Sequence, residues 1–257
     1  MTPMIFDTHA HYDDNRFNED RDTLLAEMPA RSVCGIVNAG SDLNSSRAGI
    51  AIAARYNYMW AAAGIHPHEA EDAPADFETE LRALLSMPRV VAVGEMGLDY
   101  HYDLSPRDIQ KNVFERQLTL AAVLDLPVII HSREATEDTM RIIYKHTPRG
   151  VVHCFTGSVE TAMELISLGM YIGIGGAATF RNAKRPAEVA AAIPIDRLVL
   201  ETDAPYMSPE PLRGKRCDSS MIIHTAAKIA ELRGITVDEL LLQTEINARK
   251  LFSLDKE

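Results

Sequence analysis

The alternation of short apolar runs with longer amphipathic segments is the feature that most restricts how this chain can fold. Eight apolar runs recur along the sequence, at residues 4–10, 32–40, 58–65, 90–97, 126–132, 150–155, 170–176 and 198–205. Strands that are buried on both faces have nearly continuous apolar sequences, whereas strands with one solvated face alternate. The runs therefore predict a parallel sheet whose two faces are both covered.

Helical patterns fill nearly all the gaps between these runs. They cover residues 20–28, 44–56, 77–87, 105–124, 136–146 and 158–169, with a short helix at 185–194 and two final helices at 219–234 and 236–252. Eight βα units in 257 residues match the usual size of a (β/α)8 TIM barrel. We therefore predict an α/β fold of this type, as one domain over residues 1–257. A doubly wound open sheet is the alternative, but no Gly-rich nucleotide loop follows the first run.

Two histidines stand at the end of the first apolar run. His9 and His11 are two residues apart, so in a strand both side chains point to the same side. A single histidine at a strand end is more often a surface residue. A pair on one face favours a metal, because neutral imidazole is the commonest metal-ligating side chain.

Other polar residues occupy the same place in later units, where a barrel of this type carries its active site. They are His66 and His68 after the third run, Glu95 in the fourth, His131 in the fifth, His153 in the sixth and Asp203 in the eighth. Six of the nine histidines thus share one end of the barrel. Burying so many titratable groups without a bound cation is costly. The candidate metal ligands are His9, His11, Glu95, His131, His153 and Asp203.

Six ligands exceed the four of one tetrahedral zinc ion, so the sequence predicts two divalent ions bridged by Glu95. Imidazole and carboxylate without sulfur suit Zn²⁺, Mn²⁺, Co²⁺ or Mg²⁺. Two ions about 4 Å apart can hold a hydroxide nucleophile for a displacement at phosphorus. We expect Asp203 to ligate metal and to orient or deprotonate the attacking water.

Several neighbouring residues have open roles. His66 is placed to act at the reacting centre, and we expect it to contact the scissile phosphate rather than metal. His68 follows a proline and is more simply a loop residue. Asp7 and Glu201 share strand faces with ligands, and for the deeper Glu201 we expect a hydrogen bond to a ligand. Cys154 is expected to pack rather than to ligate.

Six segments together resemble the TatD family of metal-dependent deoxyribonucleases. They are DTHAHY, GIHPHEA, VAVGEMGLDYHYD, LPVIIHSREA, VVHCFTGS and LVLETDAPYMSP, and the similarity runs from Phe6 to about Phe252. The resemblance implies metal ligands at the same six residues and hydrolysis of phosphodiesters, often from a 3′ end. It departs at residues 217–220, where Cys-Asp-Ser-Ser replaces the Asn-Glu-Pro usual in the family. This departure puts the choice of substrate in doubt.

The net charge of −11 opposes broad contact with nucleic acid, since phosphate is mostly bound by Lys and Arg. Basic residues nevertheless follow the seventh and eighth runs, and we expect them to rim the metal end of the barrel. They are Arg181, Lys184, Arg185, Arg213, Lys215 and Arg216. Arg133, just after His131, is the expected phosphate clamp because a guanidinium binds phosphate with two parallel hydrogen bonds. The expected partner is therefore single-stranded DNA, or RNA, and no obligatory protein partner is evident.

Two other functions use or reinterpret the same residues. An esterase or deacylase of aminoacyl-tRNA, or a small-molecule amidase or lactonase, would direct the same hydroxide at a carbonyl carbon. A non-enzymatic barrel would use the metal for stability alone, but structural sites tend to be closed rather than at an open barrel end.

The expected location is the cytoplasm. The chain has three cysteines with no CxxC spacing, which argues against a disulfide framework. It shows no secretory leader pattern at its start and no apolar run of membrane-spanning length.

Overall fold

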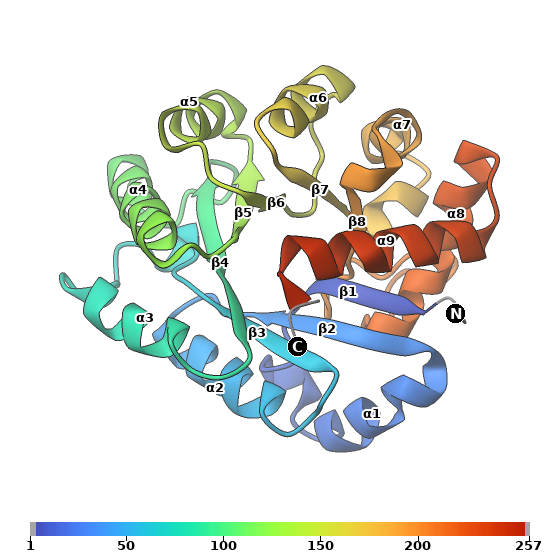
Figure 1. Ribbon diagram of the computed structural model, residues 1–257, viewed down its shortest axis with the longest axis horizontal. Helices are drawn as coiled ribbons and strands as arrows, with labels where there is room; N and C mark the ends of the chain where they lie inside the picture. The colour runs from blue at the N-terminus through green and yellow to red at the C-terminus, as the bar shows by residue number, and fades with distance from the viewer. Residues whose placement is uncertain (1–3, 255–257) are drawn as a thin grey trace.

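Eight parallel strands surround a central axis, as the sequence predicts, with helices on the outside (Figure 1). The computed structural model describes residues 4–254. The strands are β1 Ile5–Ala10, β2 Val33–Ala39, β3 Met59–Ala63, β4 Val90–Asp99, β5 Val128–Arg133, β6 Gly150–Val152, β7 Tyr171–Ile174 and β8 Leu198–Leu200. Each of them falls in one of the eight apolar runs, and only β6 and β8 end more than two residues before their run does, so the predicted (β/α)8 barrel is confirmed.

Helices follow the strands in turn. They are α1 Arg21–Glu27, α2 Leu43–Ala53, α3 Phe77–Leu85, α4 Arg107–Leu124, α5 Thr136–His146, α6 Val159–Ser167, α7 Lys184–Ala192, α8 Ile222–Arg233 and α9 Val237–Leu251. Side chains fix several of their starts: Asp42 and Ser45 form a capping box on α2, and Thr236 and Glu239 form one on α9. The helix after β7 has only nine residues, as the short pattern at 185–194 predicts.

The ring closes between β8 and β1 through a short stretch of backbone pairing. A single bridge joins Ala10 to Ala204, with the His11 amide donating to the Ala204 carbonyl at 2.7 Å. Below it, side chains hold the two strands together. The carboxylate of Asp7 accepts hydrogen bonds from the Thr202 amide (3.0 Å) and the Thr202 hydroxyl (2.6 Å). Asp7 therefore has a structural role in this seam.

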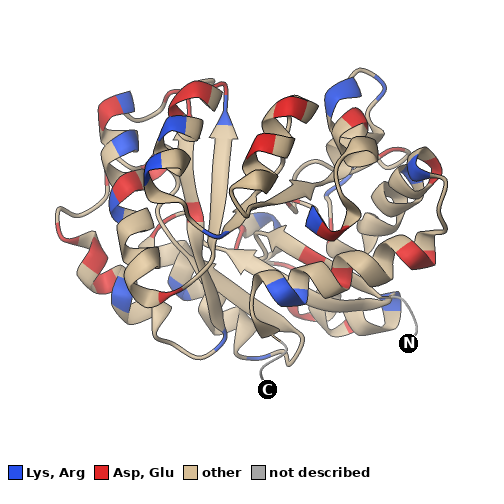
Figure 2. Ribbon diagram, turned by 45° about the horizontal axis from the view of Figure 1, so that its top comes forward, with Lys and Arg blue, Asp and Glu red and all other residues tan. Residues whose placement is uncertain are grey.

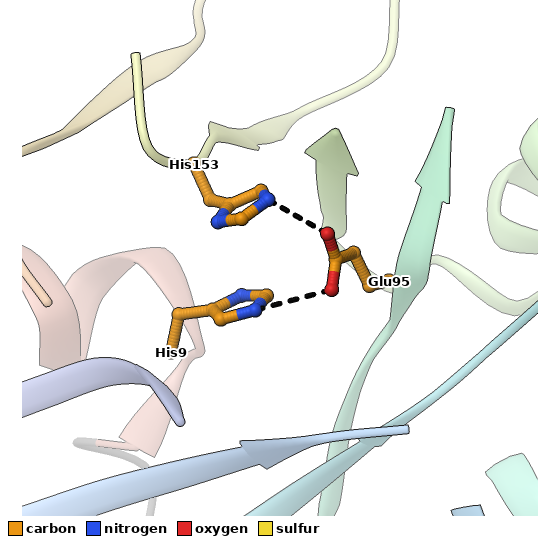
Figure 3. A group of neighbouring side chains, drawn as sticks. All are labelled: His9, Glu95 and His153. Atoms are coloured by element: carbon orange, nitrogen blue, oxygen red, sulfur yellow. Dashed lines mark ion pairs between the residues drawn. The ribbon is translucent and has the colours of Figure 1, made fainter. Parts of the chain in front are cut away.

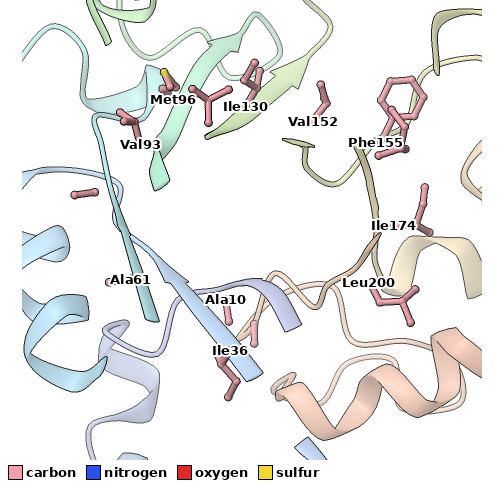
Figure 4. Packing of buried hydrophobic residues seen from close by; sticks show 14 of the residues in the cluster. Ala10, Ile36, Ala61, Val93, Met96, Ile130, Val152, Phe155, Ile174 and Leu200 are labelled. Atoms are coloured by element: carbon pink, nitrogen blue, oxygen red, sulfur yellow. The ribbon is translucent and has the colours of Figure 1, made fainter. Parts of the chain in front are cut away.

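Two apolar layers fill the molecule. One lies between the strands and the surrounding helices, and Figure 4 shows part of it, including Ile36, Ile130 and Leu200. The other fills the lower half of the barrel and is closed from below by the end of α9. Its members are Phe6, Val37, Ala62, Ala92, Ile129, Val151, Val199, Ala248, Leu251 and Phe252. The other half of the barrel interior, at the C-terminal ends of the strands, holds polar side chains.

Charged residues lie mainly on the outer helices and loops, while the strands are largely uncharged (Figure 2). Within residues 4–254, no helix combines the length and the apolar character needed to cross a bilayer.

Candidate metal centre

The polar side chains of the barrel interior lie next to the apolar layer, toward the C-terminal ends of the strands. His131, on β5, comes two residues after the inward-facing Ile129, and His153, directly after β6, comes two residues after the inward-facing Val151. Because side chains two apart share a face of a strand, these histidines continue the interior into the open end of the barrel. The structure therefore places these two histidines at the open end of the barrel, at the C-terminal ends of the strands, where the sequence predicts them.

Glu95 lies at the middle of the cluster, and its two oxygens face different histidines. Figure 3 shows one oxygen directed at His9 and the other at His153. Its Oε2 is 3.2 Å from His9 Nε2 and 3.5 Å from His11 Nε2. Its Oε1 is 2.7 Å from His153 Nε2 and 3.0 Å from His131 Nδ1. One carboxylate thus serves two groups of nitrogens, which is the geometry that a bridging ligand requires.

Asp203 completes the group on the Oε2 side. Its Oδ1 lies 3.4 Å from His11 Nε2 and 3.8 Å from His9 Nε2. Asp203 has a left-handed backbone conformation, with φ of 61°, which turns the chain at the end of β8. Its side chain is 21% exposed, whereas that of Glu95 is 4% exposed, so Asp203 stands nearer to solvent and to an entering substrate.

His66 lies within contact distance of the cluster, beside Glu95 and His131. Its Nε2 is 3.4 Å from Glu95 Oε1, and its ring is 4.6 Å from that of His131. Its Nδ1 accepts a hydrogen bond from the His68 amide, which leaves Nε2 directed inward. His66 is thus able to act on either a metal ion or a substrate oxygen beside Glu95.

The donor set fits divalent metal ions. Three groups of residues each bring ligand atoms within 4.8 Å of one another: His9, Glu95 and His153; His9, His11 and Asp203; and His66, Glu95 and His131. Such a set of nitrogen and carboxylate donors, without thiolate, is the chemistry that divalent first-row metals and Mg²⁺ bind.

Partners outside the cluster orient two of these rings. The Nδ1 atom of His11 lies 2.9 Å from the Ala39 carbonyl oxygen, so Nδ1 carries the proton and Nε2 faces the centre. The Nε2 atom of His131 lies 3.1 Å from Asp99 Oδ2, so its Nδ1 faces the centre. Asp99 Oδ2 is also 3.1 Å from His68 Nε2.

Asp99 is a site residue that the sequence analysis missed. The signal was present, because Glu95, Gly97 and Asp99 alternate along one face of β4. Gly97 pairs with His131 in the sheet, and a Cβ at this position would overlap the His131 carbonyl oxygen. Glycine is needed there to let β4 approach β5 closely enough for Asp99 to reach His131.

In the metal-free protein, protons on two of the histidines supply the positive charge that metal ions would otherwise bring to the cluster. Burial lowers the pKa of His11, but the hydrogen bond to Asp203 and the charge of Glu95 outweigh it and raise that pKa to about 10. The pKa of His131 is raised to about 9 because its bonds to Asp99 and Glu95 outweigh its burial. Burial lowers the pKa of His9 and of His66 to about 4. Burial also opposes the charge of Glu95, yet the surrounding histidines hold its pKa well below the usual range.

Glu201 lies beneath the centre and does not contact a ligand directly. Its Oε1 accepts the backbone N–H of Cys154 and is 3.9 Å from His153 Nδ1, too far for the expected hydrogen bond to a ligand. Burial raises the pKa of Glu201 to about 8. Cys154 belongs to none of the metal-capable groups found within residues 4–254.

The predicted basic rim is largely available to an anion. Arg133, Arg181, Lys184, Arg185, Arg213 and Lys215 form no ion pair with a carboxylate in the part of the chain that the structure describes. Arg216 differs, because its guanidinium is 2.6 Å from Asp20 Oδ2. Arg216 is therefore not part of the basic rim, which comprises Arg133, Arg181, Lys184, Arg185, Arg213 and Lys215.

The segment at 217–220 joins the barrel seam rather than the metal cluster. The Ser219 hydroxyl donates to Asp7 Oδ2 at 2.7 Å, and its amide donates to the Tyr12 hydroxyl at 2.9 Å. Proline at this position has no N–H and no hydroxyl, so it would lose both hydrogen bonds. The departure from the family pattern thus changes the hydrogen bonds that support the β1–β8 seam. It does not change any of the proposed metal ligands.

Comparisons with known proteins agree with this geometry. The sequence profile described as TatD related DNase matches residues 6–253. The chain is 42% identical to a protein of Bacillus subtilis called uncharacterized metal-dependent hydrolase YabD, over 98% of this chain and 100% of that one. It is 37% identical to a protein of Erwinia amylovora called 3′-5′ ssDNA/RNA exonuclease TatD, over 97% and 100% of the two chains. The crystal structure of YjjV, a TatD homolog from Escherichia coli, superposes with a TM-score of 0.92 at 32% identity, covering 98% of this chain and 99% of that one.

Proposed function

Because the chain belongs to the TatD-related DNase family and is a metal-dependent hydrolase, we propose that it removes nucleotides from the 3′ end of single-stranded DNA or RNA. The relative named as a 3′-5′ ssDNA/RNA exonuclease supports this substrate and polarity. The observation that carries the proposal is the division of the Glu95 oxygens between two groups of histidines, at the open end of the barrel.

We assign the metal-holding residues as follows. His9, His11 and Asp203 would hold one divalent ion together with Oε2 of Glu95, and His131 and His153 would hold a second together with its Oε1. Divalent ions held there supply Lewis acidity toward a phosphoryl oxygen and lower the pKa of a water. Zn²⁺, Mg²⁺, Mn²⁺ and Co²⁺ all suit this set of nitrogen and carboxylate donors.

The chain's own residues then have distinct tasks. Asp203 orients the attacking water and accepts its proton on Oδ1, for which an ionised carboxylate is required. Burial raises the pKa of Asp203, but the hydrogen bond and charge of His11 outweigh it and keep that pKa below the ordinary value. His66 contacts a non-bridging oxygen of the scissile phosphate through Nε2. Arg133 binds a phosphate oxygen at the mouth, and the rest of the basic rim holds the backbone of the substrate.

The remaining features support a single enzyme domain over residues 1–257 that works in the cytoplasm. One sheet of eight strands positions the site residues, with no second sheet in residues 4–254. The three cysteines are all unpaired, which is usual in a reducing compartment.

The proposal is tested with metal-stripped protein reconstituted with one metal at a time. The substrates are 5′-labelled single strands, duplex DNA, aminoacyl-tRNA and a panel of lactones. We expect ladders that shorten from the 3′ end of the single strands. Cleavage of aminoacyl-tRNA or lactones without cleavage of any oligonucleotide would overturn the proposal in favour of attack on a carbonyl carbon.

A further inference from the structure

Two exposed tyrosines stand on opposite sides of the metal centre. Tyr102, in the loop after β4, is 55% exposed, and Tyr206, after β8, is 47% exposed. The sheet runs in order from β1 to β8, so β4 and β8 are half a turn apart around the barrel. Among Phe, Trp and Tyr residues of the described chain, only Tyr144 is comparably exposed, at 49%, and it belongs to α5. Aromatic exposure is thus concentrated at the mouth of the site.

Tyr102 is fixed to the framework that orients the ligands. Its amide donates to Asp99 Oδ1 at 2.9 Å, and its ring centroid is 5.5 Å from that of His68. The His68 ring lies in turn 4.3 Å from the ring of His66. The Arg133 guanidinium lies over the tyrosine ring at 4.7 Å from its centroid.

Tyr206 is built in the same way on the other side. Its amide donates to the Asp203 carbonyl at 2.8 Å, and its hydroxyl donates to Asp14 Oδ2 at 3.4 Å. The Arg16 guanidinium lies over its ring at 3.9 Å from the centroid, and Asp14 holds that guanidinium in place. In both cases an arginine lies over one face of the ring, while about half of the residue stays exposed.

A flat aromatic ring that a neighbouring arginine holds in place and that stays about half exposed is the kind of surface on which single-stranded nucleic acids stack their bases. Such stacking tolerates any sequence, because every base has a π face. A strand laid across the barrel from β4 to β8 would pass Tyr102, then the cluster around Glu95, then Tyr206.

The basic rim distinguishes the two sides. Three of its cations follow β7 and two follow β8, so five of the six lie on the side of Tyr206: Arg181, Lys184, Arg185, Arg213 and Lys215. On the side of Tyr102 the rim offers only Arg133. A long polyanion therefore gains more by extending past Tyr206.

We propose that Tyr102 stacks on the 3′-terminal base and that Tyr206 stacks on the base before it, so that the scissile phosphodiester lies over the metal centre between them. This assignment rests on the proposed exonuclease function. It adds two base-binding residues and the direction in which the strand crosses the barrel.

The test removes one base at a time from the substrate and one ring at a time from the protein. Single strands carry an abasic nucleotide at the 3′ terminus, at the penultimate position, or nowhere. Each is cleaved by the wild type, Tyr102→Ala, Tyr206→Ala, the two Tyr→Phe variants and Tyr144→Ala, all with matched metal content and melting temperature. Tyr144→Ala is the control, because it removes an exposed ring away from the site.

We expect wild-type kcat/KM to fall by at least about fivefold for either abasic strand, the lower end of a stacking contribution. Tyr102→Ala should show a similar fall on the intact strand and no further fall when the terminal base is missing. It should still respond to loss of the penultimate base. Tyr206→Ala should show the reverse pattern, and the Phe variants and Tyr144→Ala should behave as the wild type.

If both alanine variants still respond to each missing base as the wild type does, the stacking assignment is wrong although the exonuclease stands. A reversed pattern, with Tyr102 sensitive to the penultimate base, would also overturn it. If the wild type cleaves no oligonucleotide with any metal, the proposed function itself fails, and the two failures are thereby distinguished.

Discussion

Asp99 and His131 form a hydrogen-bonded pair in which the carboxylate lies 3.1 Å from His131 Nε2, on the side of the ring away from Glu95. The pair fixes which nitrogen faces the metal centre, and it makes the imidazole more basic. We expect Asp99→Asn to weaken metal binding by about ten- to a hundredfold, the usual effect of losing such a partner. Metal titration by calorimetry measures this.

A second variant shows whether the effect passes through His131. Because Asp99 also contacts His68, His68→Ala serves as the matched control and should keep wild-type metal affinity. An Asp99→Asn protein that binds metal as the wild type does would show that the register of the sheet alone positions His131.

Loss of the Glu95 carboxylate should remove more than one metal site. Its oxygens face His9 on one side and His153 on the other, so Glu95→Ala deprives both proposed sites of a ligand at once. Metal analysis after gel filtration should show the metal content falling by more than one ion per chain relative to the wild type. The exposed Glu188 on α7 supplies the control Glu188→Ala, and full retention of metal by Glu95→Ala would exclude a bridging role.

Replacement of Asp203 by asparagine should spare the fold and abolish most activity. An amide fills the same space and accepts a hydrogen bond, but it cannot take a proton from water. We expect kcat on single strands to fall by at least about a hundredfold, the lower range for loss of a general base. Asp196→Asn, just before the other end of β8, is the matched control. Near-normal turnover by Asp203→Asn at full metal content would refute the assignment.

Metal binding should compete with protons. In the metal-free protein, the pKa of His11 is raised to about 10 and that of His131 to about 9, so both rings hold a proton at pH 7. A metal ion binds neutral imidazole and must displace these protons, so apparent metal affinity should increase as pH rises from about 6 toward about 9.

Calorimetry of metal binding in two buffers with different ionisation enthalpies counts the protons released. Asp203→Asn removes a carboxylate that raises the pKa of His11, so this variant should release fewer protons at pH 7. Binding that releases no proton at pH 7 in the wild type would contradict the expectation.

The basic rim should bind the substrate backbone without regard to sequence. Replacing Arg181, Lys184, Arg213 and Lys215 by Ala should raise KM for every oligonucleotide. On single strands it should also flatten the dependence of log affinity on log salt, by up to about 0.7 for each phosphate that is no longer neutralised. Turnover of a small chromogenic phosphodiester should be unchanged, because it does not reach the rim.

The control removes the same number of cations from helices outside the basic rim. It carries alanine at Arg82, Arg141, Lys145 and Lys228. Wild-type cleavage of oligonucleotides by the rim variant at every salt concentration would count against a polyanionic substrate.

The strands and the proposed ligands could be predicted for related physical reasons. Parallel strands covered on both faces must be apolar, so polar residues at their ends stand out. His131 and His153 each lie near the end of such a run, two residues after an inward-facing apolar residue, so they stay on the inward face. Convergence of the six predicted ligands then follows from the barrel, because all eight strands end at one mouth.

Contacts between neighbouring strands were harder to predict. The bond from Asp99 to His131 depends on the register of β4 against β5, which shifts between Val93 and Met96. No periodicity in the sequence reports such a shift. For Glu201, the sequence indicated its depth but not that the Cys154 amide would occupy its oxygen. The arginines over Tyr102 and Tyr206 belong to other strands or loops, so their pairing is visible only in the fold.

The β1–β8 seam also means that the metal centre can form only after the last strand of the barrel has been synthesised. Asp7 and Thr202, whose hydrogen bonds close the ring, are 195 positions apart in the chain. At translation rates of about 5–20 residues per second, Asp203 leaves the ribosome roughly 10–40 s after His9. During that interval the nascent chain carries His9 and His11 without Asp203 and without a closed ring. The complete set of proposed ligands therefore exists only in the finished barrel, and a fragment that ends before β8, which lacks both Asp203 and the Asp7–Thr202 closure, should bind metal more weakly than the full chain.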